Sequence, residues 1–323
     1  MTKRTRLFIF VSGGILVAGL GTGLVTAYVG GFQNLTLLGS SGPDELSYLP
    51  SDAKVVAFAN VREIMDSELH NKLRDTSTRS DHGLARFEEE TGVDVTRDVD
   101  SVYAAMGGPE AVDGPMPGQP LIMVRGRFDL VRIEGVVRSK GGAAEDYKGV
   151  RLLTATEPNG SMAGAVAFVE PGLIAMGADA AVRRAIDAHA SGAANASGND
   201  ELMRLVWGAN DGNAWVVARF DALSSAGHIP QEMLQKLPAI NWVTVTGHVN
   251  GGVRAAIRAE ARDDVAARNL REVVTGMLAL AKLGASQQSE VSALVNSIEL
   301  GGEGNTVSLG LSVPIEVFDR LAG

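Results

Sequence analysis

The sequence predicts an α+β protein in which one N-terminal transmembrane helix is followed by an exported domain of mostly antiparallel sheets with helices, in two related halves. Three observations predict this class. Residues 7–29 form a stretch of 23 residues without a charge. Short β-branched strand patterns alternate with amphipathic helix patterns through the rest of the chain. A stretch of small and polar residues at 191–199 separates two parts in which the patterns follow a related order.

The uncharged stretch is long enough for a transmembrane helix. A helix of that length measures about 35 Å, against about 30 Å for the hydrocarbon core of a bilayer. Positive charges in residues 1–6 precede it, and the next charged residue is Asp44. The positive-inside bias therefore keeps residues 1–6 in the cytoplasm and exports the rest. The predicted location is the bacterial inner membrane, with a single span at 7–29 and the bulk of the chain in the periplasm.

Two features of this segment leave alternatives open. Val25-Thr26-Ala27 has the small-residue pattern of a signal-peptidase cleavage site before Tyr28, so a cleaved signal peptide competes with a retained anchor. Small residues on one stripe of the helix allow another helix to pack closely, although glycine is also simply common in membrane helices. The candidate helix-packing residues are Ser12, Gly19, Gly23 and Ala27.

Residues 30–46 are predicted to be a flexible tether, because Gly39-Ser40-Ser41-Gly42-Pro43 shows no periodicity. Apolar residues interrupt the tether and are candidates for contact with the bilayer surface or a partner. Packing against the chain's own globular part is the alternative. These candidate contact residues are Phe32, Leu35, Leu37 and Leu38.

Composition excludes several classes of protein. The chain has 323 residues, 45% of them apolar, which is enough for a large core and excludes disorder throughout. It has no cysteine, which excludes disulfides, thiolate catalysis and iron–sulfur clusters. Its formal net charge of −9 argues against nucleic acid as a partner, because phosphate binding depends on clustered lysine and arginine.

The first predicted half covers residues 47–198. Strands are expected where short apolar runs end at turn residues, and helices where apolar residues recur at helical spacing. Asp129 is expected to cap a helix, and Pro171-Gly172 to close a hairpin. The predicted strands are 54–60, 99–106, 120–128, 150–155, 163–169 and 173–176, and the predicted helices are 61–74, 84–90, 129–139 and 180–190.

The second predicted half covers residues 199–323. Asn250-Gly251-Gly252 is a strong hairpin signal, and Asp263-Asp264 suit the N-terminus of a long helix to about Leu283. Pro314 is expected to start a short closing helix. The predicted helix before the first strand is 201–207, and the predicted strands are 214–220, 242–249, 253–262, 297–300 and 306–313.

A short internal repeat links the two halves. Arg127-Phe128-Asp129-Leu130 recurs as Arg219-Phe220-Asp221-Ala222, each at the end of a predicted strand. Such a repeat is typical of a duplicated folding unit, with the aspartates as helix caps and the arginines in structural salt bridges. A shared ligand-binding role is the alternative.

The residues that carry chemistry form no recognisable constellation. None of the five histidines has the spacing that places two metal ligands on one helix face, and no nucleophile or phosphate-loop motif occurs. In the acidic stretch from Glu88 to Asp100, Asp98 and Asp100 alternate, but no glycine follows them to form the turn of a calcium loop. We therefore predict no catalytic residue, no cofactor and no metal site.

Several segments resemble a group of membrane-anchored bacterial envelope proteins of unknown function. The resemblance covers most of residues 46–323 and rests on strand and turn patterns. It implies an exported α+β domain with two related halves, and it supplies no activity or site residues. The segments are 49–53, 147–150, 167–172, 177–182, 295–298 and 307–313.

The function expected from these observations is that of a non-catalytic, single-pass, membrane-anchored envelope protein. It would act as a binding or structural accessory subunit of a larger membrane assembly, with membrane lipid and another membrane protein or complex as partners. The alternative is a small-ligand carrier or enzyme that uses a cleft between the two halves, since clefts at domain interfaces are common binding places. The sequence leaves enzymatic activity undecided and favours its absence.

Overall fold

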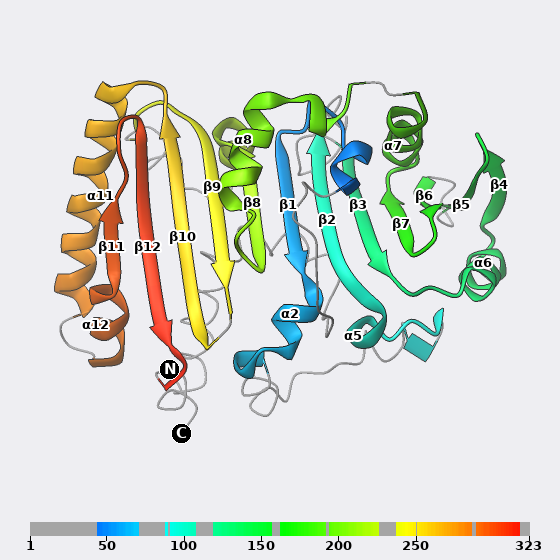
Figure 1. The fold of residues 1–323 in the computed structure, drawn as a ribbon, viewed down its shortest axis with the longest axis horizontal. Helices are drawn as coiled ribbons and strands as arrows, with labels where there is room; N and C mark the ends of the chain where they lie inside the picture. Colours follow the sequence, from blue (N-terminus) through cyan, green and yellow to red (C-terminus); the bar gives the residue numbers. More distant parts are fainter. Residues whose placement is uncertain are drawn as a thin grey trace. The chain divides into compact units, whose positions relative to one another are not determined.

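The structure is a computed structural model that describes residues 44–70, 88–89, 91–107, 119–156, 162–191, 194–225, 237–249, 251–285 and 289–316. Contacts between Cα atoms divide the chain into two compact units. The described part of the N-terminal unit comprises residues 44–66 and those of 88–208. The described part of the C-terminal unit comprises residues 67–70 and those of 209–316. Each unit is built on antiparallel strands (Figure 1).

The described part of the N-terminal unit contains seven strands in the order β1-β2-β3-β7-β6-β5-β4. Neighbouring strands pair antiparallel, and β4–β7 are joined in chain order. The strands are β1 (Val55–Asn60), β2 (Val99–Gly107), β3 (Gln119–Gly126), β4 (Ala143–Tyr147), β5 (Val150–Thr156), β6 (Met162–Glu170) and β7 (Leu173–Gly177). The helices are η1 (Asp44–Tyr48), α2 (Val61–Asp66), α5 (Val95–Asp98), α6 (Leu130–Ser139), α7 (Asp179–Ser191), η2 (Ala196–Gly198) and α8 (Asp200–Ala209).

The core of this unit lies on both faces of its central strands. Side chains alternate between faces along a strand, so Met123 and Ala175, which are paired across β3 and β7, share one face and are both fully buried. Helix α7 contacts β3, β6, β7 and η1, and both helices lie in front of these strands in Figure 1. On the opposite face, Ile122 and Val124 pack with Val102 in a second cluster.

Among the residues described in the C-terminal unit there are five strands, in the order β11-β12-β10-β9-β8. The strands are β8 (Ala214–Arg219), β9 (Ile240–His248), β10 (Gly252–Ala261), β11 (Ile298–Gly301) and β12 (Thr306–Pro314). The helices are α9 (Phe220–Ser225), α11 (Asp264–Ala285) and α12 (Ser289–Asn296). Helix α11 buries Ala267 and Leu270 against Val307 of β12, which forms the core on one face of these strands.

The short repeat falls at different places in the two units. Arg127–Leu130 follow β3 and lead into α6, whereas Arg219–Ala222 end β8 and begin α9. Asp129 accepts a hydrogen bond from the Arg132 backbone N–H at 3.0 Å, which confirms the predicted helix cap. Asp221 instead forms an ion pair with Arg219, with 3.3 Å between Nε and Oδ1.

The predicted fold class is wrong. The described strands belong to a large antiparallel sheet of twelve strands, in place of several sheets. None of the helices in the described ranges is long and apolar enough to span a membrane. Even α11, with 22 residues, carries charged residues along its length. The prediction of a single-pass transmembrane protein is corrected accordingly, and residues 7–29, on which it rested, lie outside the described residues.

Candidate functional site

The site residues predicted from the sequence lie outside the described part of the chain. This holds for the predicted helix-packing residues and for the predicted partner contacts, so both sets stay predictions. Within the described ranges, no group of three or more His, Cys, Asp or Glu side chains is placed to hold a metal ion. The undescribed predicted residues are Ser12, Gly19, Gly23, Ala27, Phe32, Leu35, Leu37 and Leu38.

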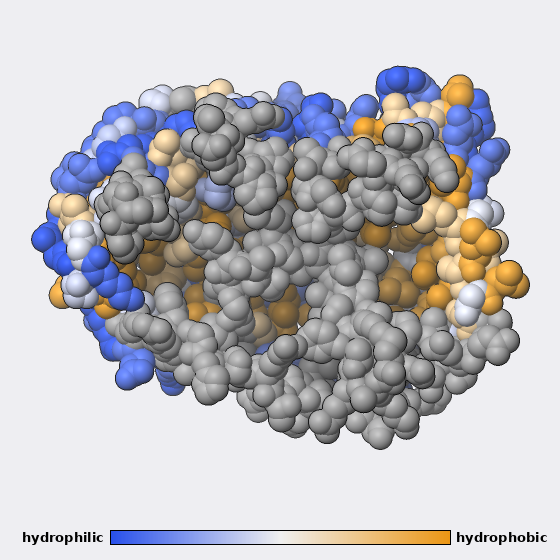
Figure 2. Space-filling view, turned by 180° about the vertical axis from the view of Figure 1, so that it is seen from behind, coloured by the Kyte–Doolittle hydropathy of each residue, from blue (hydrophilic) through white to orange (hydrophobic). Residues whose placement is uncertain are grey.

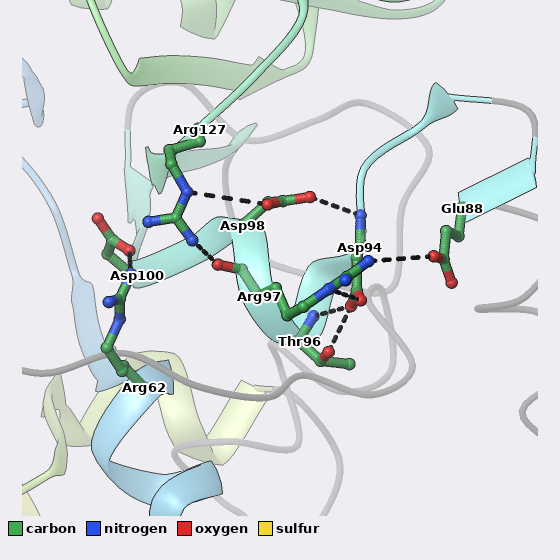
Figure 3. A network of polar contacts seen from close by, with 8 residues as sticks. All are labelled: Arg62, Glu88, Asp94, Thr96, Arg97, Asp98, Asp100 and Arg127. Carbon is green, nitrogen blue, oxygen red and sulfur yellow. Dashed lines mark hydrogen bonds and ion pairs between the residues drawn. The ribbon is translucent and has the colours of Figure 1, made fainter.

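A network of polar contacts surrounds the beginning of β2 (Figure 3). Asp94 caps the short helix α5, accepting a hydrogen bond from the Thr96 N–H at 2.8 Å, and it also accepts one from Arg97 Nε. The carboxylate of Asp98 accepts a hydrogen bond from the backbone N–H of Asp94 at 2.9 Å. Burial alone would raise the pKa of Asp94, but the hydrogen bonds from Thr96 and Arg97 lower it below its usual range. Asp94 is therefore ionised at neutral pH, and its carboxylate stabilises the turn at the beginning of α5.

The same network contains a buried arginine. Arg62 in α2 is 2% exposed and forms an ion pair with Asp100 in β2, which is 40% exposed. The Nε atom of Arg62 is buried and has no hydrogen-bond partner among the residues described. Asp98 contacts the guanidinium of a second arginine, Arg127, at 3.8 Å. Each basic group here lies against an acidic one, so the network ties α2, α5 and the segment after β3 to the beginning of β2 (Figure 3).

A second cluster lies where η1 and α7 cover the N-terminal unit. Arg125 of β3 forms ion pairs with Glu45 of η1, which is 8% exposed, and with Glu170 of β6 at 3.4 Å. The Tyr48 hydroxyl donates to Glu170 at 2.9 Å. Burial, together with this hydrogen bond, raises the pKa of Tyr48 above its ordinary value. Tyr48 keeps its proton at neutral pH and is not a base.

Ser47 and His189 lie beside this cluster, and a serine next to a histidine can form a catalytic pair. The His189 ring stacks on Tyr48 with centroids 4.0 Å apart, and its Nδ1 is 3.2 Å from the Ser47 hydroxyl oxygen. The Ser47 hydroxyl donates its own proton to the Asp44 carbonyl at 2.6 Å. With its proton donated to this carbonyl, the Ser47 hydroxyl can accept a hydrogen bond from Nδ1 of His189.

The C-terminal unit presents a different kind of surface on β10 and β12. Residues 254, 256, 258 and 260 of β10 share the face opposite the one that packs on α11, because side chains alternate along a strand. Arg254 and Arg258 are both exposed on this face. We call it the arginine face, and define it by Arg254, Ala256 and Arg258 with their paired neighbours on β9 and β12.

The strand register places hydroxyl groups beside both arginines. Arg258 is paired with Thr244 on β9 and Ser308 on β12. Arg254 is paired in the same way with His248 and Ser312. The two arginines are about 13 Å apart along the strand at the usual rise per residue.

A row of residues with small side chains separates the two arginines. Ala256 and Gly310 are paired between them and have small side chains or none. Thr244 is buried, so the surface has two positive groups, each with a serine of β12 (Ser308 or Ser312) at its side, and small residues between them. Such groups make charge-assisted hydrogen bonds to carboxylates.

Sequence reasoning missed the arginine face, although part of the signal was present. The alternation Arg254-Ala255-Ala256-Ile257-Arg258 predicts that both arginines share a face of one strand. The register that brings Thr244 and Ser308 beside Arg258 depends on pairing between distant parts of the chain. No local spacing in the sequence gives that register.

Comparisons with known proteins add little. No family model matches the chain, and no curated protein matches it. Among solved structures, the chain is similar to one described as crystal form I of TP0453, at 11% identity, with 88% of this chain and 100% of that chain covered and a TM-score of 0.47. At this level of similarity we draw no conclusion about fold or function.

Proposed function

We propose that this protein is a non-catalytic binding protein, an accessory subunit that attaches to another protein of a larger assembly through the arginine face. The observation that carries the proposal is the exposure of Arg254 and Arg258 on the same face of β10. The matching partner is a protein segment that carries carboxylates. Two arginines with flanking hydroxyls recognise carboxylates by paired hydrogen bonds and charge.

The chemistry of the face favours an acidic protein segment over nucleic acid. The chain as a whole has a net charge of −9, which repels a polyanion at long range. Glu260 and Glu299 lie on the same face as the arginines and repel carboxylates as well as phosphates, so the spacing of the two arginines is what distinguishes the partners. Two arginines about 13 Å apart suit two separated carboxylates, whereas a nucleic acid strand presents a phosphate about every 3.4 Å of the duplex axis.

The polar clusters of the N-terminal unit support a structural role for the buried charges. Glu45 and Arg125 neutralise one another across η1 and β3. Burial alone would lower the pKa of Arg125, but its contacts with Glu45 and Glu170 raise it. Ser47 already donates its proton to a backbone carbonyl. These groups are arranged to hold the fold in place.

The test is site-specific photo-crosslinking in the cells that make the protein. A photo-reactive amino acid replaces Ser312, which is exposed beside Arg254. The matched control replaces Val131 of α6, which is 83% exposed and lies in the other unit. We expect a discrete protein adduct from position 312 that disappears when Arg254→Glu and Arg258→Glu are added. The proposal fails if position 312 gives no adduct, or if the adduct survives both charge reversals.

A further inference from the structure

Helix α11 has one face that packs on its own sheet. Ala266, Ala267 and Leu270 are buried there, with exposures of 6%, 0% and 4%. They contact β10 and β12 residues in the core cluster of the C-terminal unit, and Val274 joins them as a partly buried member. At 100° per residue these positions lie on one side of the helix. This side is the part of α11 that belongs to the core of the C-terminal unit.

Toward its C-terminal end the opposite side of α11 is also apolar and exposed, whereas the exposed Arg268 and Glu272 lie on this side nearer its N-terminal end. Leu280 is 71% exposed, Leu283 75% and Val265 56%. Lys282 is the one charged residue between 273 and 285. Figure 2 views the molecule from behind and shows hydrophobic residues gathered at the margin where α11 lies. Exposed apolar surface concentrated on one helix marks an interaction site.

Large and small residues alternate on this outward side. Gly276 and Ala279 lie within about 100° of Leu280 and Leu283 on the helix. A Cβ built on Gly276 meets no atom within 4 Å, so the space beside this glycine is open. The outward side therefore has two projecting leucines toward its C-terminal end and two shallow positions toward its N-terminal end.

We propose that this side of α11 binds a second copy of the chain through an antiparallel, twofold-symmetric helix pair. A twofold axis between Ala279 and Leu280 pairs each residue with a residue of the other copy so that their numbers add to 559. Leu283 then lies over Gly276 of the second copy, and Leu280 over Ala279 of the second copy. Each projecting side chain meets a shallow position, and the symmetry makes both halves of the contact identical.

A second copy fits this surface better than an unrelated helix does. The pattern is complementary to itself, and the paired segment 276–283 carries a single charge, Lys282. The contact spans about two helical turns, roughly 12 Å. It buries less than the roughly 1,600 Å² of a standard interface, so we expect a weak, concentration-dependent dimer. This proposal is independent of the arginine face, which lies on β10 and β12.

Cysteine crosslinking tests the arrangement, because the natural chain has no cysteine. Ala279→Cys places a single thiol next to the proposed axis, where two copies approach within the roughly 7 Å that a disulfide allows between Cα atoms. Val265→Cys places one on the same side of the same helix, about 43 Å from its copy in the antiparallel pair. With a mild added oxidant, we expect a covalent dimer from Ala279→Cys and none from Val265→Cys. Equal crosslinking of the two, or none from Ala279→Cys, overturns the proposal.

Sedimentation of the full chain provides the second readout. Leu280→Glu puts a charge at a position that is already 71% exposed, so the fold is retained while the dimer is lost. The matched control is Val131→Glu, at an 83% exposed position on α6, which leaves the dimer intact. A wild-type chain that stays monomeric up to the highest soluble concentration overturns the proposal. The Arg254→Glu and Arg258→Glu chain still dimerises, which separates this test from that of the proposed function.

Discussion

Asp94 carries a measurable share of the stability at the residue scale. It caps α5 and accepts from both Thr96 and Arg97. We expect Asp94→Ala to lower the free energy of unfolding by about 1–2 kcal/mol at neutral pH, as measured by urea denaturation. Asp94→Asn is the control and is expected to cost less, because asparagine also caps helices. Equal losses for the two variants would contradict the role of the cap.

The contribution of Asp94 depends on pH in a defined direction. Its pKa is lowered below the usual 3.8 in the folded protein. The folded state therefore binds fewer protons than the unfolded state around this pH, and the stabilisation is complete above the ordinary value. The difference in unfolding free energy between wild type and Asp94→Ala is expected to shrink as the pH falls from about 5 towards 2. A difference that stays constant over this range would contradict the lowered pKa.

The pair of Arg62 and Asp100 gives an asymmetric prediction. Asp100→Ala leaves the buried guanidinium without its carboxylate, which costs about 3–5 kcal/mol for a buried charge. Arg62→Met removes the buried charge together with its unpartnered Nε and costs much less. Adding Arg62→Met to Asp100→Ala therefore restores most of the lost stability in urea denaturation. No recovery in the double variant would contradict the account.

The roles of residues that contact their neighbours in the sequence could be predicted, whereas contacts between residues far apart in the sequence could not. Asp129 stands directly before a segment with apolar residues at helical spacing, which predicts that it caps the helix, and the structure confirms this cap. The pairing of Arg62 with Asp100 joins residues 38 positions apart, and that of Arg125 with Glu45 joins residues 80 apart. Such pairs depend on the strand order, which no local pattern encodes.

At the scale of elements, hydrophobic periodicity was a good guide to the central strands and the long helices. The predicted strand at 54–60 is β1 (Val55–Asn60), and the predicted helix from Asp263-Asp264 to Leu283 is α11 (Asp264–Ala285). Strand β4 was missed, because Ala143–Tyr147 is a largely exposed edge strand with two adjacent acidic residues and no alternation. The helix predicted at 61–74 is interrupted: α2 covers Val61–Asp66, Ser67 is a bend and residues 68–70 are helical again, while residues 71–74 lie outside the described part of the chain.

Two glycines test how the elements pack. Gly177 at the end of β7 has a φ of +153°, and a Cβ there would lie 2.2 Å from the Pro120 carbonyl oxygen. We expect Gly177→Ala to lower the free energy of unfolding by about 1–3 kcal/mol. Gly135 in α6 has open space around it, and Gly135→Ala is expected to raise stability by about 0.5–1 kcal/mol through helix propensity. Thermal or urea denaturation measures both, and shifts of the same sign would contradict the packing at β7.

At the scale of the whole molecule, the sequence predicted a membrane helix and several sheets, and the structure corrected both. The uncharged stretch at 7–29 dominated the prediction, and it lies outside the described residues. Strand order is the part that sequence cannot supply, because β7 returns beside β3 across three intervening strands, and β12 beside β10 across α11 and α12. Each local pattern is compatible with more than one such order.

The central claim is that the arginine face holds this protein in an assembly. Native sizing of complexes from cells that make the full-length chain tests it most directly, with wild type compared with Arg254→Glu, Arg258→Glu. The control, Arg262→Glu, Arg268→Glu, makes the same change in net charge at two exposed positions in the same unit. We predict that wild type and control migrate in the assembly and that the arginine-face variant is released from it. Unchanged migration of a folded arginine-face variant would contradict the claim.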